Sequence, residues 1–191
     1  MIDISKITGR QKLTIAKGLC DYCYIMDNWK KNDDDFKDVF YNFYLKARWS
    51  IMNKPENRIP YFDKLKSIKQ TDNIMDILED LKKEMYSHSY EFSIASKLLH
   101  TRNPQNPIYD SKVRNYLSKE EGVVFCWKHS DDSIKEKQDI KHDWNELKLW
   151  YDNILSSKRG EEWIKWFDTN FPNYKNISNI KKIDFIIFAT R

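Results

Sequence analysis

Residues 93–114 read SIASKLLHTRNPQNPIYDSKVR and join two predicted helices through a loop that holds two prolines. Pro104 and Pro107 fix φ and lack an amide proton, so the chain between them is not helical. Asp110 carries the short acceptor side chain that caps the first amides of a helix. The stretch therefore predicts a lysine-bearing helix, a stiff loop, and a second helix that begins at Asp110.

Helical patterns continue on both sides of this stretch. Apolar residues recur at spacings of three and four, and Phe36, Phe40 and Phe43 form the strongest such stripe. Aromatic residues make up 15% of the chain, whereas glycine occurs 4 times and proline 5 times, which is typical of long helices packed through large rings. We expect helices over residues 11–31, 34–51, 60–68, 71–86, 93–103, 110–122, 131–155, 161–171 and 177–188.

Three residues are expected to mark the ends of helices. Pro60 is placed in the first turn of its helix, where proline is tolerated. Thr71 is expected to cap the following helix, and Gly160 to mark a break before the helix of Trp163. The short apolar run Val123–Trp127 is treated as buried extended chain.

The predicted fold class is all-α, a compact multi-helix domain of about eight or nine helices. A chain of 191 residues can bury an ordinary core as one domain over residues 1–191, with two interleaved lobes as the alternative arrangement.

Charge and cysteine content narrow the possible partners and compartments. The net charge of +4 arises from 33 basic and 29 acidic residues, a mildly basic balance that permits a DNA partner without requiring one. Three cysteines are too few for a disulfide framework, which favours a reducing compartment.

No apolar run reaches the roughly 20 residues that span a bilayer, and the start lacks a signal-peptide core. We therefore expect a cytoplasmic protein without membrane association.

Lys97 and Asp110 are the candidate catalytic residues. A lysine kept neutral by desolvation is an amine nucleophile, and a nearby carboxylate can accept its proton or stabilise a cation. The alternative is that Asp110 only caps its helix and that Lys97 extends from an apolar helix toward solvent.

The segments Ser96–Leu99 (SKLL) and Pro107–Val113 (PIYDSKV) together resemble the core of the helix–hairpin–helix DNA glycosylase superfamily. In that superfamily, a helix that carries a lysine in some members leads through a loop to a Pro-x-Asp-Thr-x-Val-like segment. The aspartate is essential there, and the lysine, where present, forms a Schiff base with the sugar. The resemblance implies a glycosylase-like fold in which Asp110 takes the aspartate role and Lys97 the lysine role.

The function implied by the resemblance is base excision from DNA, with no cofactor. The family's hairpin holds a DNA phosphate through glycine amides, but the corresponding segment Tyr86–Ile94 contains no glycine. The alternative function is a non-catalytic helical scaffold that binds nucleic acid or a protein partner. The substrate base and the oligomeric state are left open.

Basic residues around the loop are the candidate nucleic-acid contacts: Arg102, Lys112, Arg114 and His100. His100 follows Lys97 on the same helix face, where it could contact a phosphate or the lysine. The alternative for His100 is a structural histidine bonded to the proline loop.

No metal site is predicted. The four histidines of the chain show no recognised zinc spacing. Cys20 and Cys23 form a C-x-x-C pair, which elsewhere binds metal or acts in redox chemistry, but here the pair falls on a helical stripe and is expected to pack in the core.

Overall fold

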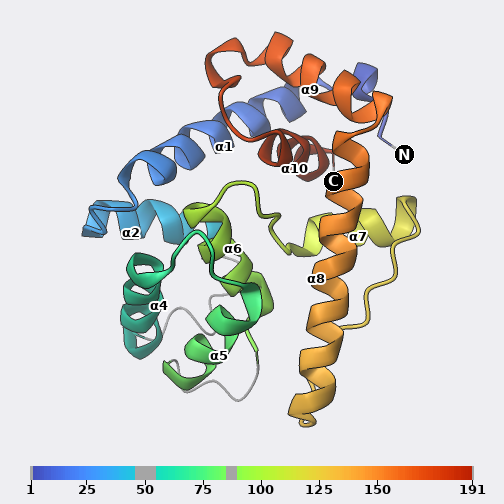
Figure 1. The fold of residues 1–191 in the computed structure, drawn as a ribbon. Coiled ribbons are helices and arrows are strands. Elements are labelled where there is room, and N and C mark those ends of the chain that lie inside the picture. The colour runs from blue at the N-terminus through green and yellow to red at the C-terminus, as the bar shows by residue number, and fades with distance from the viewer. Residues whose placement is uncertain (1, 46–54, 85–89, 191) are drawn as a thin grey trace.

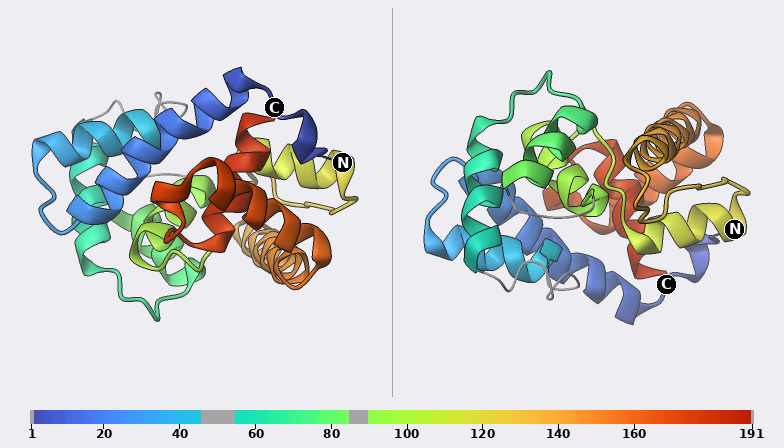
Figure 2. Two further views of the ribbon diagram at one scale, coloured as in Figure 1. Left: turned by 90° about the horizontal axis from the view of Figure 1, so that it is seen from above. Right: turned by 90° about the horizontal axis from the view of Figure 1, so that it is seen from below.

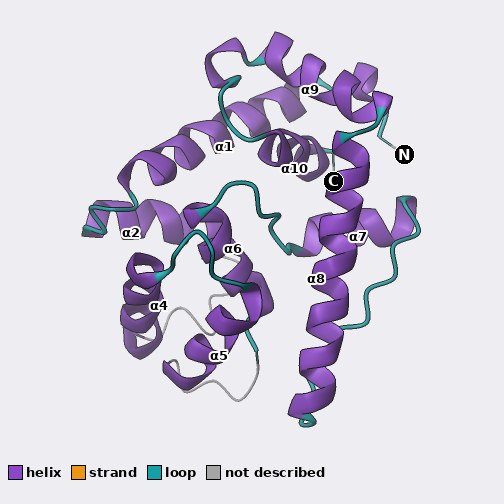
Figure 3. Ribbon diagram, in the orientation of Figure 1, coloured by secondary structure: helices purple, strands orange, loops and turns teal. Residues whose placement is uncertain are grey.

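The computed structural model describes residues 2–45, 55–84 and 90–190. These residues form nine α-helices and no strand (Figure 1), which confirms the all-α prediction. Loops, two short 3-10 turns (Ile4–Lys6 and Pro172–Tyr174) and a π-helical turn (Tyr41–Leu45) make up the rest of the described residues (Figure 3). The predicted helical positions 46–51, 85 and 86 lie outside the described residues. The helices are α1 (Gly9–Asn28), α2 (Asp34–Phe40), α4 (Pro55–Ser67), α5 (Ile74–Glu84), α6 (Phe92–Arg102), α7 (Ser111–Glu120), α8 (Ser133–Leu155), α9 (Lys158–Asn170) and α10 (Asn179–Ala189).

The N-terminal helix packs among the C-terminal helices. α1 contacts α10, and α10 also contacts α7, α8 and α9. Figure 2 shows α10 near the centre of the molecule in both views. The helices α4, α5 and α6 contact one another in a second group. The predicted phenylalanine stripe connects the two groups, because α2 contacts α1 while its rings of Phe36 and Phe40 meet Phe62 of α4.

Two helices are buried on nearly all sides. Every residue of α6 from Phe92 to Thr101 is buried, and so is most of α10. A helix enclosed in this way also buries its polar side chains, which is costly unless those groups find partners. α6 and α10 thus bring charged groups into the interior. No helix in the described ranges is both long enough and apolar enough to cross a membrane.

α4 starts earlier than predicted. Pro55 is its first residue and Pro60 lies inside it, so the placement of Pro60 in the first turn is wrong. Pro55 fits the first helical position because no amide donor is needed there. Pro60 removes one hydrogen bond from the helix, and burial of the following residues Tyr61, Phe62 and Leu65 offsets that loss.

The cap of α5 is Asn73, not Thr71. The Asn73 side-chain oxygen accepts hydrogen bonds from the backbone amides of Met75 and Asp76, at 2.9 and 3.0 Å. Asparagine caps a helix as well as threonine does or better, so the polar residue nearest the apolar run takes this position.

Gly160 does not break a helix. It lies in the first turn of α9, whose cap is Ser157. A Cβ at position 160 would lie 1.9 Å from the carbonyl oxygen of Ile154 at the end of α8. The glycine therefore allows close packing of the α8–α9 junction, and the predicted boundary is wrong by about one turn.

The segment before α8 is non-helical, as predicted, but its burial alternates. Trp127 is buried, whereas Val124 is 67% exposed and Cys126 is exposed. The amides of Cys126 and Trp127 donate to the carboxylate of Asp143 on α8. This attachment holds the segment along α8 with every second side chain directed outward.

The cysteine pair on α1 lies at the edge of the core. Cys20 is exposed and Cys23 is half-buried, so the prediction that both pack in the core is wrong for Cys20. The buried stripe of α1 consists of Ile15, Leu19, Tyr22 and Ile25.

Candidate functional site

Lys97 and Asp110 line one cavity. The cavity lies between α1, α6, α10 and the start of α7, and its volume is about 80 Å³, several times what one water molecule needs. Lys181 and Asp184 of α10 line it as well. We call these four residues the charged cluster. The aromatic lining residues are Phe43, Tyr44, Phe185 and Phe188.

Lys97 reaches the cavity from the interior of α6. Its residue is 5% exposed, and its Nζ donates to the Ser93 hydroxyl one turn earlier at 2.9 Å. Because α6 is buried, the Lys97 amine contacts polar protein atoms and lines the cavity, and it is not exposed to bulk water. Burial of this kind is a condition for a nucleophilic lysine.

Asp110 caps α7, as the sequence predicts. Its Oδ1 accepts the Lys112 amide at 2.8 Å, and its backbone is extended. The proline loop is fixed just before it, because the Tyr109 amide donates to the Ser96 hydroxyl at 3.0 Å and the Tyr109 ring stacks on Phe92 at 4.0 Å between centroids. These contacts fix the backbone before Asp110 and so place this cap residue at the edge of the cavity.

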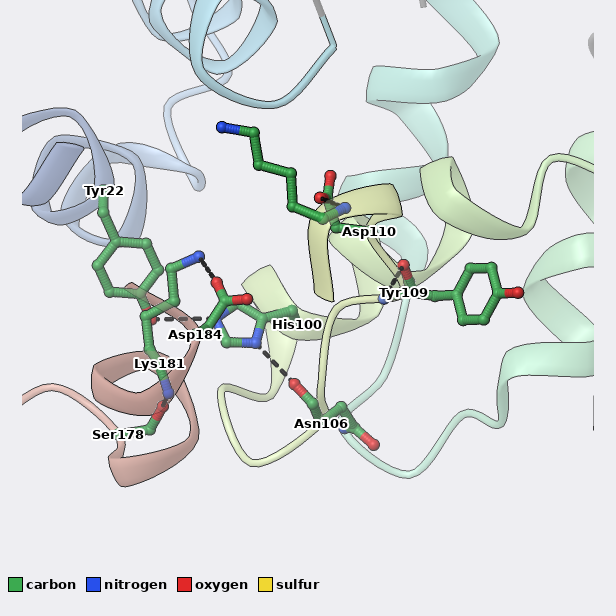
Figure 4. Close-up of polar contacts among 10 residues, drawn as sticks. Tyr22, His100, Asn106, Tyr109, Asp110, Ser178, Lys181 and Asp184 are labelled. Carbon is green, nitrogen blue, oxygen red and sulfur yellow. Dashed lines mark hydrogen bonds and ion pairs between the residues drawn. The ribbon is translucent and has the colours of Figure 1, made fainter. Parts of the chain in front are cut away.

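Lys181 and Asp184 form an ion pair within the cluster. Lys181 Nζ lies 2.6 Å from Asp184 Oδ2, and both side chains are at least nine-tenths buried (Figure 4). Burial is the main cause of a raised pKa of Asp184. Lys181 opposes that rise, Asp110 adds to it, and Lys97 lowers the pKa. Asp184 is therefore electrostatically coupled to the other three members of the cluster.

Aromatic rings surround the Lys181 ammonium. Its Nζ lies 4.9 Å from the ring centre of Phe185 and between 5.2 and 5.5 Å from those of Tyr22, Tyr44 and Phe43. Ring faces attract a cation at these distances. The rings and the carboxylate of Asp184 together hold this charge against the cavity wall.

His100 lies fully buried behind the cluster. Nδ1 is 2.6 Å from the carbonyl oxygen of Asn106, which can only accept, so Nδ1 carries the proton. Nε2, 3.1 Å from the Tyr22 hydroxyl, then accepts from it (Figure 4). Burial and, to a smaller extent, the Lys181 cation lower the pKa of His100 to about 3, although the hydrogen bond to Asn106 opposes them. This environment corresponds to the structural alternative for His100.

The predicted basic residues lie in different environments. Arg102 is half-buried, with its guanidinium 3.7 Å from the ring centre of Trp29 and its Nε bonded to the Ile68 carbonyl. Lys112 places its Nζ 3.8 Å from the ring centre of Phe188, one of the residues that line the cavity. Arg114, one turn into α7, is partly exposed. Lys112 thus lies beside the cavity, whereas Arg102 serves packing between α6 and its neighbours.

Sequence reasoning missed Lys181 and Asp184. A usable signal was present, because a Lys and an Asp three positions apart stand within the apolar run of α10. On a helix that is apolar all round, such a pair has to be buried and matched.

Residues 86–89 of the segment that corresponds to the family's hairpin lie outside the described residues. Comparison of the chain with protein families, with characterised proteins and with solved structures finds no match.

Proposed function

We propose that the chain is a base-excision DNA glycosylase in which Lys97 is the nucleophile and Asp110 assists it. One observation carries the proposal: a buried lysine amine and a helix-cap carboxylate, separated in sequence by the proline loop, line the same cavity. Chemistry by this pair requires both groups to open to one space, and packing alone does not require it.

The proposed step begins with a base flipped into the cavity. The neutral Lys97 amine attacks C1′ of the deoxyribose, and the bond from C1′ to the base breaks with its electron pair leaving on the base. Asp110 accepts the proton released by the amine and passes it to the departing base. The ring oxygen then leaves C1′ and takes a proton as the C1′=Nζ imine forms.

The other cavity residues suit this proposal in two ways. Aromatic faces such as those of Phe43 and Phe185 can stack on a flipped base. Lys112, which lies over the ring of the cavity residue Phe188, and the partly exposed Arg114 would contact the flanking phosphates. His100 is left out of the contact set because both of its ring nitrogens are bonded inside the protein. Arg102 is left out because its Nε bonds the Ile68 carbonyl and its guanidinium lies over the Trp29 ring.

Borohydride trapping tests the proposal. The protein is incubated with abasic, uracil-containing, oxidised-base and alkylated-base duplexes in the presence of borohydride, which reduces an imine to a stable amine. We expect a covalent protein–DNA adduct with at least one duplex on a denaturing gel. Lys97→Gln should abolish it, and Lys119→Gln, which alters an exposed lysine on α7, should retain it.

One further variant and one further readout guard against misinterpretation. Lys97→Met keeps the aliphatic stem of the buried side chain, so a folded Lys97→Met protein without adduct separates lost chemistry from lost structure. An adduct that survives in both Lys97 variants contradicts the proposal. Base release without an adduct would instead indicate a glycosylase that uses Asp110 and water.

The second candidate function is a non-catalytic scaffold that binds nucleic acid or a protein partner. The observation that favours it is the hydrogen bond from the Lys112 amide to Asp110, which gives the carboxylate a structural role that needs no chemistry. This candidate is preferred if the protein is folded and yields neither adduct nor base release with any duplex. Fluorescence anisotropy with duplex and single-stranded DNA then separates the two kinds of partner.

A further inference from the structure

Three potential metal ligands meet on the side of the molecule where the non-helical segment runs along α8. The Cys126 sulfur, a His142 ring nitrogen and an Asp143 carboxylate oxygen all lie within 4.8 Å of one another. Thiolate, imidazole and carboxylate are the three side-chain ligand types that zinc takes. The cluster joins two parts of the chain, which explains why no sequence spacing indicated it.

The closest pair in this cluster already has the spacing of two zinc ligands. His142 Nδ1 and Asp143 Oδ1 are 3.3 Å apart. Ligand bonds of about 2.0–2.2 Å at a tetrahedral angle put two ligand atoms about 3.3–3.5 Å apart. Two lone pairs facing each other at this distance repel, so a proton or a cation must lie between them. A metal ion can take the place of that proton.

Asp143 is held in position by its other hydrogen bonds. Its Oδ1 accepts the Cys126 amide at 2.7 Å, and its Oδ2 accepts the Trp127 amide at 3.2 Å and the Tyr109 hydroxyl at 2.8 Å. Hydrogen bonds of this kind orient metal-binding carboxylates in known sites. They also fix the backbone of Cys126 beside the carboxylate, so the thiol needs only a side-chain adjustment to approach an ion.

The other two ligands can be reached from solvent. Cys126 is exposed, and 45% of the His142 side chain is exposed, whereas Asp143 is fully buried. An ion can therefore enter without unfolding, and it would displace protons from a thiol and an imidazole. Three protein ligands leave a fourth tetrahedral position for water.

We propose that Cys126, His142 and Asp143 form a binding site for a divalent transition-metal ion of the zinc type. The bound ion fastens the segment before α8 to the helix at a point where the backbone amides of Cys126 and Trp127 already attach. This site is separate from the charged cluster, and its occupancy is measured without any DNA substrate.

Cobalt(II) titration of the metal-free full chain tests the site. A thiolate ligand gives Co²⁺ an intense near-ultraviolet charge-transfer band. We expect this band to saturate at one Co²⁺ per chain and to disappear on addition of Zn²⁺. A chain that shows no band contradicts the proposal.

Matched variants identify the ligands. Cys126→Ser should abolish the band, and His142→Gln should weaken Co²⁺ binding at least about tenfold. Both side chains are exposed, and a thermal melt verifies that each variant is folded. The double variant Cys20→Ser/Cys23→Ser removes the remaining cysteines of the chain and should keep the band. A band that depends on Cys20 and Cys23, or that His142→Gln leaves unchanged, overturns this ligand set.

Discussion

Two lysines, Lys97 and Lys181, line the same cavity. Lys181 is paired with the carboxylate of Asp184 and surrounded by ring faces, an arrangement that fixes a cation. Lys97 donates to the neutral hydroxyl of Ser93, which can accept from the amine in either protonation state. The ion pair engages the Lys181 amine with a carboxylate, so we propose Lys97, and not Lys181, as the nucleophile.

The two roles of Asp110 can be separated by substitution. Asn caps a helix about as well as Asp but carries no charge, so Asp110→Asn should keep the free energy of unfolding within about 0.5 kcal/mol. Asp110→Ala should lower it by about 1 kcal/mol, because the Lys112 amide loses its acceptor. Both variants should lose adduct formation and base release. Urea unfolding and the trapping assay measure the two effects independently.

The cap of α8 supplies the control for Asp110. Asp132 accepts the amides of Ile134 and Lys135 and does not line the cavity. Asp132→Ala should therefore cost a similar amount of stability and leave activity intact. Full activity in Asp110→Asn would reduce Asp110 to a cap and remove it from the proposed mechanism.

The junction between α8 and α9 depends on the absence of a side chain at Gly160. A methyl group there would lie 1.9 Å from the Ile154 carbonyl, so Gly160→Ala must shift the helices and should lower the free energy of unfolding by at least about 2 kcal/mol. At Gly9, the first residue of α1, an added Cβ meets nothing within 4 Å. Gly9→Ala should leave stability unchanged or slightly raise it, and equal effects of the two variants in urea unfolding would contradict this account.

Local signals predicted most helices, and packing decided the boundaries where they failed. Asp33 and Asp110 cap the helices that their sequences indicate, because a cap is formed within one turn of chain. The predictions for Gly160 and Pro60 are wrong because tertiary packing decides both positions. Gly160 packs closely against the end of α8, and the residues that follow Pro60 are buried. The predicted break at Gly160 is instead a close contact with the Ile154 carbonyl at the end of α8. The spacing of apolar residues along the sequence gives no information about such a contact.

At the scale of the whole molecule, the candidate site combines segments that are far apart in sequence. Lys97 and Asp110 could be predicted because one helix–loop–helix carries both. Lys181 and Asp184 come from the C-terminal helix, and Cys126 meets His142 only because a non-helical segment folds back along α8. Such meetings depend on tertiary topology, so the sequence indicated half of the charged cluster and none of the metal cluster.

His100 links α1, α6 and the proline loop. Its protonation should therefore change the free energy of unfolding of the whole chain. It bonds Tyr22 of α1 and the Asn106 carbonyl of the proline loop from its own position on α6. The pKa of His100 is about 3 in the folded chain, against about 6.5 for an exposed histidine, so the unfolded chain binds the proton more readily. The stability from the neutral imidazole is complete above pH 6.5 and declines as the pH falls toward 3.

We therefore expect His100 to make the free energy of unfolding fall by up to about 1.4 kcal/mol per pH unit between pH 6 and pH 4.5. Asp184, whose pKa is raised, acts in the opposite direction, because its folded form binds protons more readily as the pH falls toward its titration range. Urea unfolding over this pH range should show a shallower pH dependence for His100→Gln than for the unaltered chain. Tyr22→Phe, which removes the hydroxyl partner but keeps the imidazole, should lower stability throughout and retain the steep dependence. Equal slopes for His100→Gln and the unaltered chain would show that this buried histidine does not couple protonation to the integrity of the fold.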